Sequence, residues 1–256
     1  MGRLAGKVAI VTGAARGTGE ATARRFAEEG ARVVLTDVLD DRGHAAAAAI
    51  GGEVRYRRLD VAREADWAEV VEETEARFGR LDLLVNNAAI LHMAAIETTA
   101  LADWERVVSV NQTGPFLGIR AVIPAMRRAG GGSIVNVASL DGLEGLERFG
   151  AYAATKWALR GLARCAALEL GRDGIRVNTV CPAGGSDEMA APFRPPGVVP
   201  EAYVADRAIP RRARLEEIAS MIVFLASDES SFCTGADFTV DGGATAGKRL
   251  PVGRGA

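Results

Sequence analysis

The segment AYAATKWALR, residues 151–160, places Tyr152 and Lys156 four residues apart in a largely apolar stretch. Lysine is scarce in this chain, because only three of its 31 basic residues are lysines. Residues four apart share a helix face, and a tyrosine with a pKa near about 10 becomes a usable base when positive charge stabilises its phenolate. A compact ammonium supplies that charge and reaches sugar hydroxyls better than a guanidinium does. The pair indicates proton transfer to or from an oxygen atom, although a lone YxxxK also occurs as an incidental surface pair.

A glycine-rich turn follows the first apolar run of the chain. The segment TGAARGTG contains Gly13, Gly17, Thr18 and Gly19 and leads directly into a helical pattern. Glycines at such a turn let the backbone approach a pyrophosphate, whose charge then meets free N–H groups at a helix N-terminus. Alone, the spacing is equally typical of a tight strand-to-helix connection. We treat these four residues as candidates for binding a dinucleotide.

The second apolar run, ARVVLTD, ends at Asp37, 24 positions after Gly13. A carboxylate at this point can accept both adenosine-ribose hydroxyls of NAD and repels the 2′-phosphate of NADP. Arg16 in the glycine turn favours the opposite choice, because it can pair with that phosphate. Since an arginine can turn to solvent or pair with Asp37, whereas the repulsion is fixed, we predict NAD, with NADP the less favoured cofactor.

These residues need a scaffold, and the hydrophobic pattern indicates which one. Short β-branched runs alternate with longer helical segments along the chain. The runs are 7–12, 31–37, 54–61, 81–87, 132–139, 175–180 and 236–242, and the helical segments are 17–30, 40–50, 63–78, 101–129, 150–170 and 214–226. Such alternation predicts right-handed crossovers and a parallel sheet covered on both faces. We therefore expect an α/β chain, a single-domain Rossmann-like doubly wound parallel sheet of about seven strands with helices on both faces.

The length of 256 residues suits one dinucleotide-binding and catalytic domain, 1–256, rather than two domains with separate cores. Residues 182–212 interrupt the alternation and hold six of the nine prolines, so we predict a lid segment there. The segment 244–256 is expected to be a loose C-terminal tail.

Composition excludes several classes of protein. With 48% hydrophobic residues, 25% charged residues and a net charge of −2, the chain lacks the basic footprint of a nucleic-acid binder. The start, MGRLAGKVAIVTG, contains neither a signal peptide nor an acylation signal, so a cytoplasmic location without membrane attachment is expected. The three cysteines form no CxxC pair and are expected to be buried free thiols, and the two histidines lie far apart, so no metal site is predicted.

Several motifs together resemble the short-chain dehydrogenase/reductase family. They are TGAARGTG at 12–19, LDV at 59–61, NNAA at 86–89, Asn111 in VNQTG, Ser139 in IVNVAS, and YAATK starting 13 residues after that serine. The resemblance extends to Gly243. Within the family, segments such as ATKWALRGL and LASDESSFCTGADFTVDGG look most like the bacterial 3α/20β-hydroxysteroid dehydrogenases.

The resemblance implies a role for each matching residue. Tyr152 is the expected general acid/base, Lys156 lowers its pKa and binds the nicotinamide ribose, and Ser139 binds the substrate oxygen. Asn111 is expected to hold a water that links Lys156 to solvent. The expected adenine contacts are Asp60 and Val61, the expected ribose contacts are Asn87 and Ala88, and Pro182 and Gly185 complete the cofactor set.

Two positions depart from the family pattern. Ala89 stands where the family often has glycine, which matters if the backbone there requires a positive φ. After the sixth strand, PAGGSDEM places Asp187 where the family usually has the threonine that meets the nicotinamide carboxamide. Either Asp187 or the neighbouring Ser186 could accept a bond from that amide.

Residues expected around the reacting carbon are mostly apolar, which favours a hydrophobic, steroid-like secondary alcohol or ketone. The substrate candidates are Ser139, Leu140, Leu146, Phe149, Met189 and Phe193. These apolar side chains could equally pack the lid against the body.

Two other functions remain open at this stage. One is a β-ketoacyl carrier-protein reductase that uses NADPH, with Arg194, Arg207, Arg211 and Arg212 forming a basic entrance; Asp37 argues against it. The other is a dinucleotide sensor without turnover, which would not need serine, tyrosine and lysine in register. Surplus apolar positions on the helices 101–129 and 150–170 predict a homotetramer.

Overall fold

The computed structural model describes residues 2–184, 187–193, 204–205 and 207–247. Its centre is a seven-stranded sheet of order β3-β2-β1-β4-β5-β6-β7 in which every pairing is parallel. The strands are β1 Val8–Thr12, β2 Arg32–Asp37, β3 Val54–Arg58, β4 Leu83–Asn86, β5 Gly132–Val137, β6 Ile175–Pro182 and β7 Asp237–Val240. The predicted doubly wound sheet is therefore confirmed.

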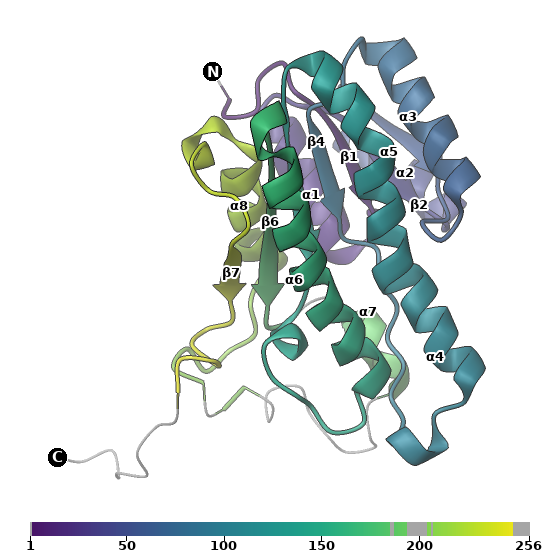
Figure 1. Ribbon diagram of the computed structural model, residues 1–256, viewed down its shortest axis with the longest axis vertical. Coiled ribbons are helices and arrows are strands. Elements are labelled where there is room, and N and C mark those ends of the chain that lie inside the picture. The colour runs from purple at the N-terminus through teal and green to yellow at the C-terminus, as the bar shows by residue number, and fades with distance from the viewer. Residues whose placement is uncertain (1, 185–186, 194–203, 206, 248–256) are drawn as a thin grey trace, which may run out of the picture.

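Helices cover both faces of this sheet (Figure 1). They are α1 Gly17–Glu28, α2 Asp40–Ile50, α3 Glu64–Phe78, α4 Leu101–Val108, α5 Gly114–Ala129, α6 Gly150–Leu170, α7 Asp187–Ala190 and α8 Leu215–Ala226. The 3-10 turns among the described residues are η1 Ile96–Thr98, η3 Leu140–Gly142, η4 Gly171–Asp173, η5 Ala191–Phe193 and η7 Asp228–Ser230. None of the described helices is both long and apolar enough to cross a lipid bilayer.

Each face of the sheet has its own hydrophobic core. Trp67 of α3, Val122 of α5 and Ala163 of α6 pack on one face, and all are almost fully buried. Phe26 of α1 and Ile222 of α8 belong to the cluster on the other face. Burying a side chain of this size contributes about 1.5–3 kcal/mol, so the apolar strands are held from both sides and their carboxyl ends have fixed positions.

The order of the strands creates a crevice at one edge. From β1 the chain proceeds outward through β2 to β3 and then returns to β4 on the other side of β1. The connections on the two sides of β1 therefore diverge, and a crevice opens beyond the carboxyl ends of β1 and β4. The glycine turn, Asp37 and Ser139 all follow the carboxyl ends of strands and meet at this edge.

The predicted helix over 101–129 contains an interruption that the sequence pattern did not indicate. Residues Ser109–Thr113, η2, form a π-helical turn between α4 and α5. Such turns are often found at functional sites, and this one holds Asn111.

The remaining sequence predictions have mixed outcomes. In the segment 182–212, the described parts include the short helix α7 and the turn η5, while 185–186, 194–203 and 206 lie outside the described residues. Of the tail, residues 244–247 form turns in which Thr245 donates to Asp241, and 248–256 lie outside the described residues. The cysteines are free, but only Cys181 is buried and Cys165 is exposed, so the expectation of three buried thiols was wrong.

Candidate active site

A pocket of about 520 Å³ lies at the carboxyl ends of the central strands. It receives side chains from the turn after β1, the end of β2, the segments after β3, β4 and β5, and helix α6. Most of the predicted cofactor residues line it: Gly13, Arg16, Gly17, Thr18, Asp37, Asp60, Val61, Asn87, Ala88, Tyr152, Lys156 and Pro182. Ser139 lines the same pocket, so the two groups of candidate residues face one space.

The glycine turn forms a cradle that side chains would fill. Gly13 and Gly17 have φ values of 61° and 60°, in the left-handed region that favours glycine. A Cβ on Gly13 would lie 2.6 Å from the Cα of Ala88, and one on Gly19 would lie 2.3 Å from the Gly13 carbonyl oxygen. Gly19 is itself buried, so it serves close packing rather than pocket lining. Backbone this compact at the start of α1 fits a pyrophosphate.

Asp37 is fixed at the end of β2 by backbone donors. Its Oδ1 accepts from the N–H groups of Val38 and Leu39 at 2.8 and 3.1 Å, and its Oδ2 accepts from the N–H of Ala15 at 3.1 Å. The Tyr56 hydroxyl lies 2.8 Å from the Asp37 carbonyl oxygen. A carboxylate oxygen can accept more than one hydrogen bond, so both oxygens still have capacity for ribose hydroxyls.

Arg16 does not pair with Asp37; it turns toward Glu188 of α7, with which it forms an ion pair. Arg42 of α2 reaches the same carboxylate at 2.7 Å. The two arginines hold the pKa of Glu188 below its ordinary value. Because these pairs are exposed and screened by solvent, the arrangement neutralises the charge of Arg16 without fixing its side chain in place.

Asn87 and Asp60, which follow β4 and β3, also line the pocket. The side-chain amide of Asn87 donates to the carbonyl oxygens of Thr12 and Gly13 at 2.9 and 3.0 Å, which ties it to the glycine turn. Asp60 accepts from the N–H of Ala62 at 3.0 Å. Asn87 therefore holds the glycine turn in shape. The segments that contain Asp60 and Asn87 both form part of the pocket surface.

Ser139, Tyr152 and Lys156 come together from two elements. Ser139 follows β5, and the other two lie one turn apart on α6. Tyr152 and Lys156 are 7% and 3% exposed, the Lys156 Nζ donates to the Val137 carbonyl oxygen at 2.8 Å, and it lies 5.4 Å from the centre of the Tyr152 ring. The Ser139 hydroxyl lies near enough to Tyr152 to lower the pKa of the phenol. A hydroxyl pair backed by a buried amine can bind an oxygen atom and exchange a proton with it.

The electrostatics of this group differ from the sequence expectation. Burial, reinforced by the charge of Asp141, raises the pKa of Tyr152 above its ordinary value, and the Ser139 hydroxyl only partly opposes this. Burial lowers the pKa of Lys156 to about 8. The expectation that Lys156 pulls the pKa of Tyr152 below about 10 is therefore not met in this structure, because desolvation outweighs the attraction. Tyr152 is held as a protonated hydroxyl, the form that can donate.

Asn111 lies beside this group and outside the pocket lining. Its Oδ1 accepts from the Ile90 N–H and its Nδ2 donates to the Ile90 carbonyl oxygen, both at 2.8 Å. The Nδ2 also lies 3.3 Å from the Thr155 hydroxyl of α6. Asn111 thus joins the π-helical turn to the loop after β4 and to the helix that carries Tyr152. Its expected water-holding role stays a prediction.

Sequence comparison places this geometry in a known family. Residues 13–245 match the family described as enoyl-(acyl carrier protein) reductase, within the short-chain dehydrogenases and reductases. The chain is an enzyme of the short-chain dehydrogenase/reductase family. Members of this family use a nicotinamide dinucleotide, which agrees with the compact glycine cradle.

Several curated relatives are similar along nearly the whole chain. A 3-alpha-(or 20-beta)-hydroxysteroid dehydrogenase of Mycobacterium tuberculosis is 48% identical over 246 residues, covering 96% of this chain and 92% of the relative. A trans-4-hydroxycyclohexanecarboxylate dehydrogenase of Sinomonas cyclohexanicum is 42% identical, covering 97% and 96%. A cyclopentanol dehydrogenase of Comamonas testosteroni is 39% identical, covering 96% and 100%.

The departures from the family pattern have different outcomes. Ala89 needs no positive φ, because Arg148, at 68°, is the one non-glycine residue with a positive φ in the described ranges. Gly185, Ser186 and the side chain of Asp187 lie outside the described residues, so the binding of the carboxamide stays a prediction. For the dehydrogenase/reductase fold itself, the changed residue in NNAA has no structural consequence.

The predicted substrate residues fall into two groups. Met189 lines the pocket. Leu140, Leu146, Phe149 and Phe193 do not, although the Phe149 ring stands edge-on to Tyr152 with centroids 6.3 Å apart and Phe193 stands edge-on to His92 at 6.4 Å. Leu146 is 48% exposed. Sequence reasoning missed Arg106 of α4 and Ser109 and Val110 of the π-helical turn, which line the pocket.

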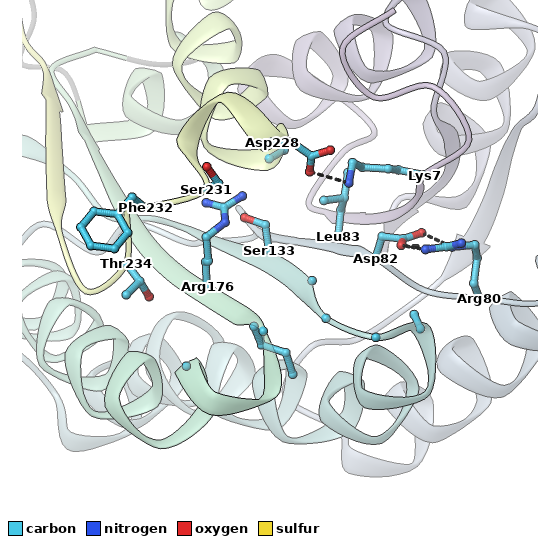
Figure 2. A pocket seen from close by; sticks show the side chains of 18 residues that line it. Lys7, Arg80, Asp82, Leu83, Ser133, Arg176, Asp228, Ser231, Phe232 and Thr234 are labelled. Carbon is cyan, nitrogen blue, oxygen red and sulfur yellow. Dashed lines mark hydrogen bonds and ion pairs between the residues drawn. The ribbon is translucent and has the colours of Figure 1, made fainter.

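A second pocket lies at the opposite, amino ends of the strands (Figure 2). Its charged side chains already have partners: Lys7 binds Asp228 at 2.9 Å, and Arg80 binds Asp82 at 2.5 Å. The Arg176 guanidinium donates to the carbonyl oxygens of Leu225 and Ser227 at 2.9 and 3.0 Å. These pairs stabilise the end of the sheet and leave the first pocket as the candidate active site.

Proposed function

We propose that this enzyme transfers a hydride between NAD(H) and a hydrophobic, cyclic secondary alcohol or its ketone. The observation that carries the proposal is one continuous pocket with Asp37 at its adenosine end and Ser139, Tyr152 and Lys156 at its reactive end. The relatives described above are named for hydroxysteroids, a hydroxycyclohexane carboxylate and cyclopentanol. A cyclic carbinol is the chemical feature common to those names.

The residues act on the oxygen of the substrate. Bound nicotinamide supplies the hydride acceptor for oxidation and the hydride donor for reduction. In reduction, Tyr152 gives its proton to the carbonyl oxygen as negative charge develops there, and Ser139 donates a hydrogen bond to the same atom. In oxidation, Tyr152 must first lose its proton, and the Lys156 ammonium stabilises the phenolate. Lys156 also supplies donors for the nicotinamide ribose.

The preference for NAD is argued from Asp37 and Arg16. Asp37 faces the pocket with carboxylate capacity for the ribose hydroxyls, whereas the Arg16 charge is balanced by Glu188. A 2′-phosphate would meet a fixed anion and an arginine that is already paired.

Cofactor choice gives a direct test of this proposal. We expect the wild type to oxidise cyclic secondary alcohols with NAD at a kcat/KM at least about tenfold above that with NADP. A tenfold ratio corresponds to a difference of about 1.4 kcal/mol in free energy. Asp37→Ala is expected to lower kcat/KM for NAD and to raise that for NADP. Asp41→Ala, four positions further on at the start of α2, is the matched control, and it should change kcat/KM for neither cofactor. Equal efficiency of the wild type with both cofactors would overturn the ranking.

The same assay separates the alternatives. A panel of steroid, cyclohexanol, cyclopentanol and short-chain β-ketoacyl substrates would show oxidation of a cyclic alcohol if the proposal holds. The carrier-protein alternative needs a basic entrance, yet Arg211 is paired with Glu217 at 2.8 Å, Arg207 donates to the Ala183 carbonyl oxygen at 3.3 Å, and Arg194 lies outside the described residues. Binding of NAD without turnover of any substrate would favour the sensor.

We also propose that the enzyme is a homotetramer with dihedral symmetry. Helices α4, α5 and α6 lie in one layer on the same face of the sheet (Figure 1). Several large apolar side chains of these helices are exposed. Trp104, Phe116, Trp157 and Leu168 are 40%, 45%, 50% and 86% exposed. Covering them against a second copy would remove this apolar surface from water.

Light scattering at micromolar concentration is expected to give four times the chain mass of 26.8 kDa. Leu168→Glu combined with Trp157→Glu should lower the mass, because two charges would enter an apolar interface. Glu169→Gln, an exposed neutral exchange on the same helix, is the control. A monomeric wild type would contradict the proposal.

A further inference from the structure

Asp141 is an acidic residue beside the reactive group that the mechanism above does not use. It lies in the turn η3, two residues after Ser139, and both its backbone N–H and its carboxylate contact the Ser139 hydroxyl. The Asp141 N–H donates to the Ser139 Oγ at 3.1 Å, and the Ser139 Oγ lies 3.0 Å from the Asp141 Oδ2. Asp141 therefore contacts the hydroxyl that is proposed to bind the substrate oxygen.

The turn cannot move away from helix α6. A Cβ on Gly142 would lie 3.0 Å from the Lys156 carbonyl oxygen, so the backbone of the turn packs directly on the helix. Arg160 of the same helix donates to the Gly142 carbonyl oxygen. Asp141 is thereby held at the reactive group, and its contact with Ser139 is part of the fold.

Three ionisable groups face Asp141 from these elements. Lys156 and Tyr152 lie on α6, and Glu144 lies on the same turn. Burial, together with the charge of Glu144, raises the pKa of the Asp141 carboxyl, while Ser139 and Lys156 lower it. An ionised Asp141 in turn raises the pKa of Tyr152. The carboxylate thus opposes the effect of Lys156 on the reacting hydroxyl.

The contact with Asp141 determines which group the single hydrogen of the Ser139 hydroxyl can reach. A serine hydroxyl has one hydrogen to donate and can accept through its lone pairs. When Asp141 is ionised, Ser139 donates that hydrogen to the carboxylate and has none for the substrate oxygen. When Asp141 carries a proton, the acid donates to the Ser139 Oγ, and the serine hydrogen is released toward the pocket.

We propose that Asp141 is a positioning residue whose protonated form directs the Ser139 hydroxyl to the substrate oxygen. This inference rests on the proposed function, because it assigns Ser139 to that oxygen. Ketone reduction should then require protons on both Asp141 and Tyr152. Its rate would fall as Asp141 ionises, at a pH below that at which Tyr152 ionises.

The test is the pH dependence of kcat for ketone reduction in Asp141→Asn. The asparagine amide can donate to the Ser139 Oγ at every pH, as the protonated acid does. On the acidic side of the profile the variant should keep the wild-type kcat. As pH rises, it should lack the decrease in kcat that ionisation of Asp141 causes in the wild type. Its advantage over the wild type should then grow by roughly tenfold per pH unit until Tyr152 titrates.

Two further variants make the result specific. Glu144→Gln removes the neighbouring carboxylate from the same turn, and we expect it to leave the two-step fall in place. In a Ser139→Ala background, Asp141→Asn should no longer remove a first fall of kcat, because the hydroxyl that it orients is absent. Only the Tyr152 step should move to lower pH, since the charge of Asp141 is lost.

The outcomes are distinct. Parallel pH profiles for wild type and Asp141→Asn, or a loss of kcat that is equal at every pH, would overturn the positioning role. Absence of turnover in the wild type with every alcohol and ketone tested would instead reject the proposed function. Thermal melting of each variant identifies a folding defect. If Asp141→Asn has one, Asp141→Glu replaces it in the test: it retains the carboxyl and should preserve the two-step decrease of kcat with pH.

Discussion

Tyr152→Phe should lower kcat by about 10²–10⁴-fold in both reaction directions, the contribution typical of a general acid–base group. The phenyl ring keeps the packing of a side chain that is 7% exposed and removes only the oxygen that holds the proton. Because no other residue takes over that proton, the loss should persist at every pH. Steady-state rates of NADH formation and consumption across the stable pH range would measure it.

The raised pKa of Tyr152 sets the direction in which the wild-type rates of reduction and oxidation change with pH. Burial and Asp141 keep the pKa of Tyr152 above its ordinary value, so the protonated hydroxyl needed for reduction is present through neutral pH. Oxidation needs the phenolate, and its rate should rise as pH increases. Tyr56→Phe is the matched control, since Tyr56 lies on β3, away from the reactive group, and its hydroxyl contacts the Asp37 carbonyl oxygen. It should alter NAD binding and leave the slope of the pH profile unchanged. Activity of Tyr152→Phe near the wild-type level would remove the tyrosine from the mechanism.

Much of the fold follows from local patterns in the sequence. Runs such as VAIVT at 8–12 are buried at every position, and a continuous apolar run bounded by glycine is typical of a strand covered on both faces. The helix 150–170 was predicted at its observed bounds. The π-helical turn at Ser109–Thr113 was missed because its residues fit an α-helical pattern as well. Its geometry depends on Asn111 binding the loop at Ile90, a contact 21 positions away.

The reactive residues were predictable because their spacing is local or their motifs are familiar. Tyr152 and Lys156 are one helical turn apart, and Asp37 ends a recognisable strand. The ion pair between Arg16 and Glu188 joins residues 172 positions apart, so no local pattern indicates it. Asp141 could have been noticed two residues after Ser139, but a charged residue in a turn ordinarily faces solvent. Only the packing of that turn on α6 reveals its contact with the serine.

Substitutions of Lys156 should have the second largest effect and separate its charge from its shape. Lys156→Met is expected to lower kcat for oxidation near neutral pH by about 10²–10³-fold, the cost of removing one group that stabilises charge in a closed site. The wild-type ammonium, which is charged below a pH of about 8, favours the phenolate, although burial and Asp141 keep the pKa of Tyr152 above its ordinary value. Without the ammonium, Tyr152 ionises only at higher pH, so the methionine variant should regain part of its rate there, measured as kcat for alcohol oxidation against pH.

Lys156→Arg tests whether charge alone is sufficient. The ammonium is 3% exposed and donates to the Val137 carbonyl oxygen at 2.8 Å, in a space bounded by the Tyr152 ring. A guanidinium keeps the charge at every pH but is larger, planar and fixed in its donor directions. It should displace Tyr152 from the pocket or turn away from the ribose, so we expect kcat to stay well below wild type and KM for NAD to rise. An arginine variant with the wild-type pH profile and wild-type KM for NAD would show that charge is enough, and that the compact shape of lysine has no part in catalysis.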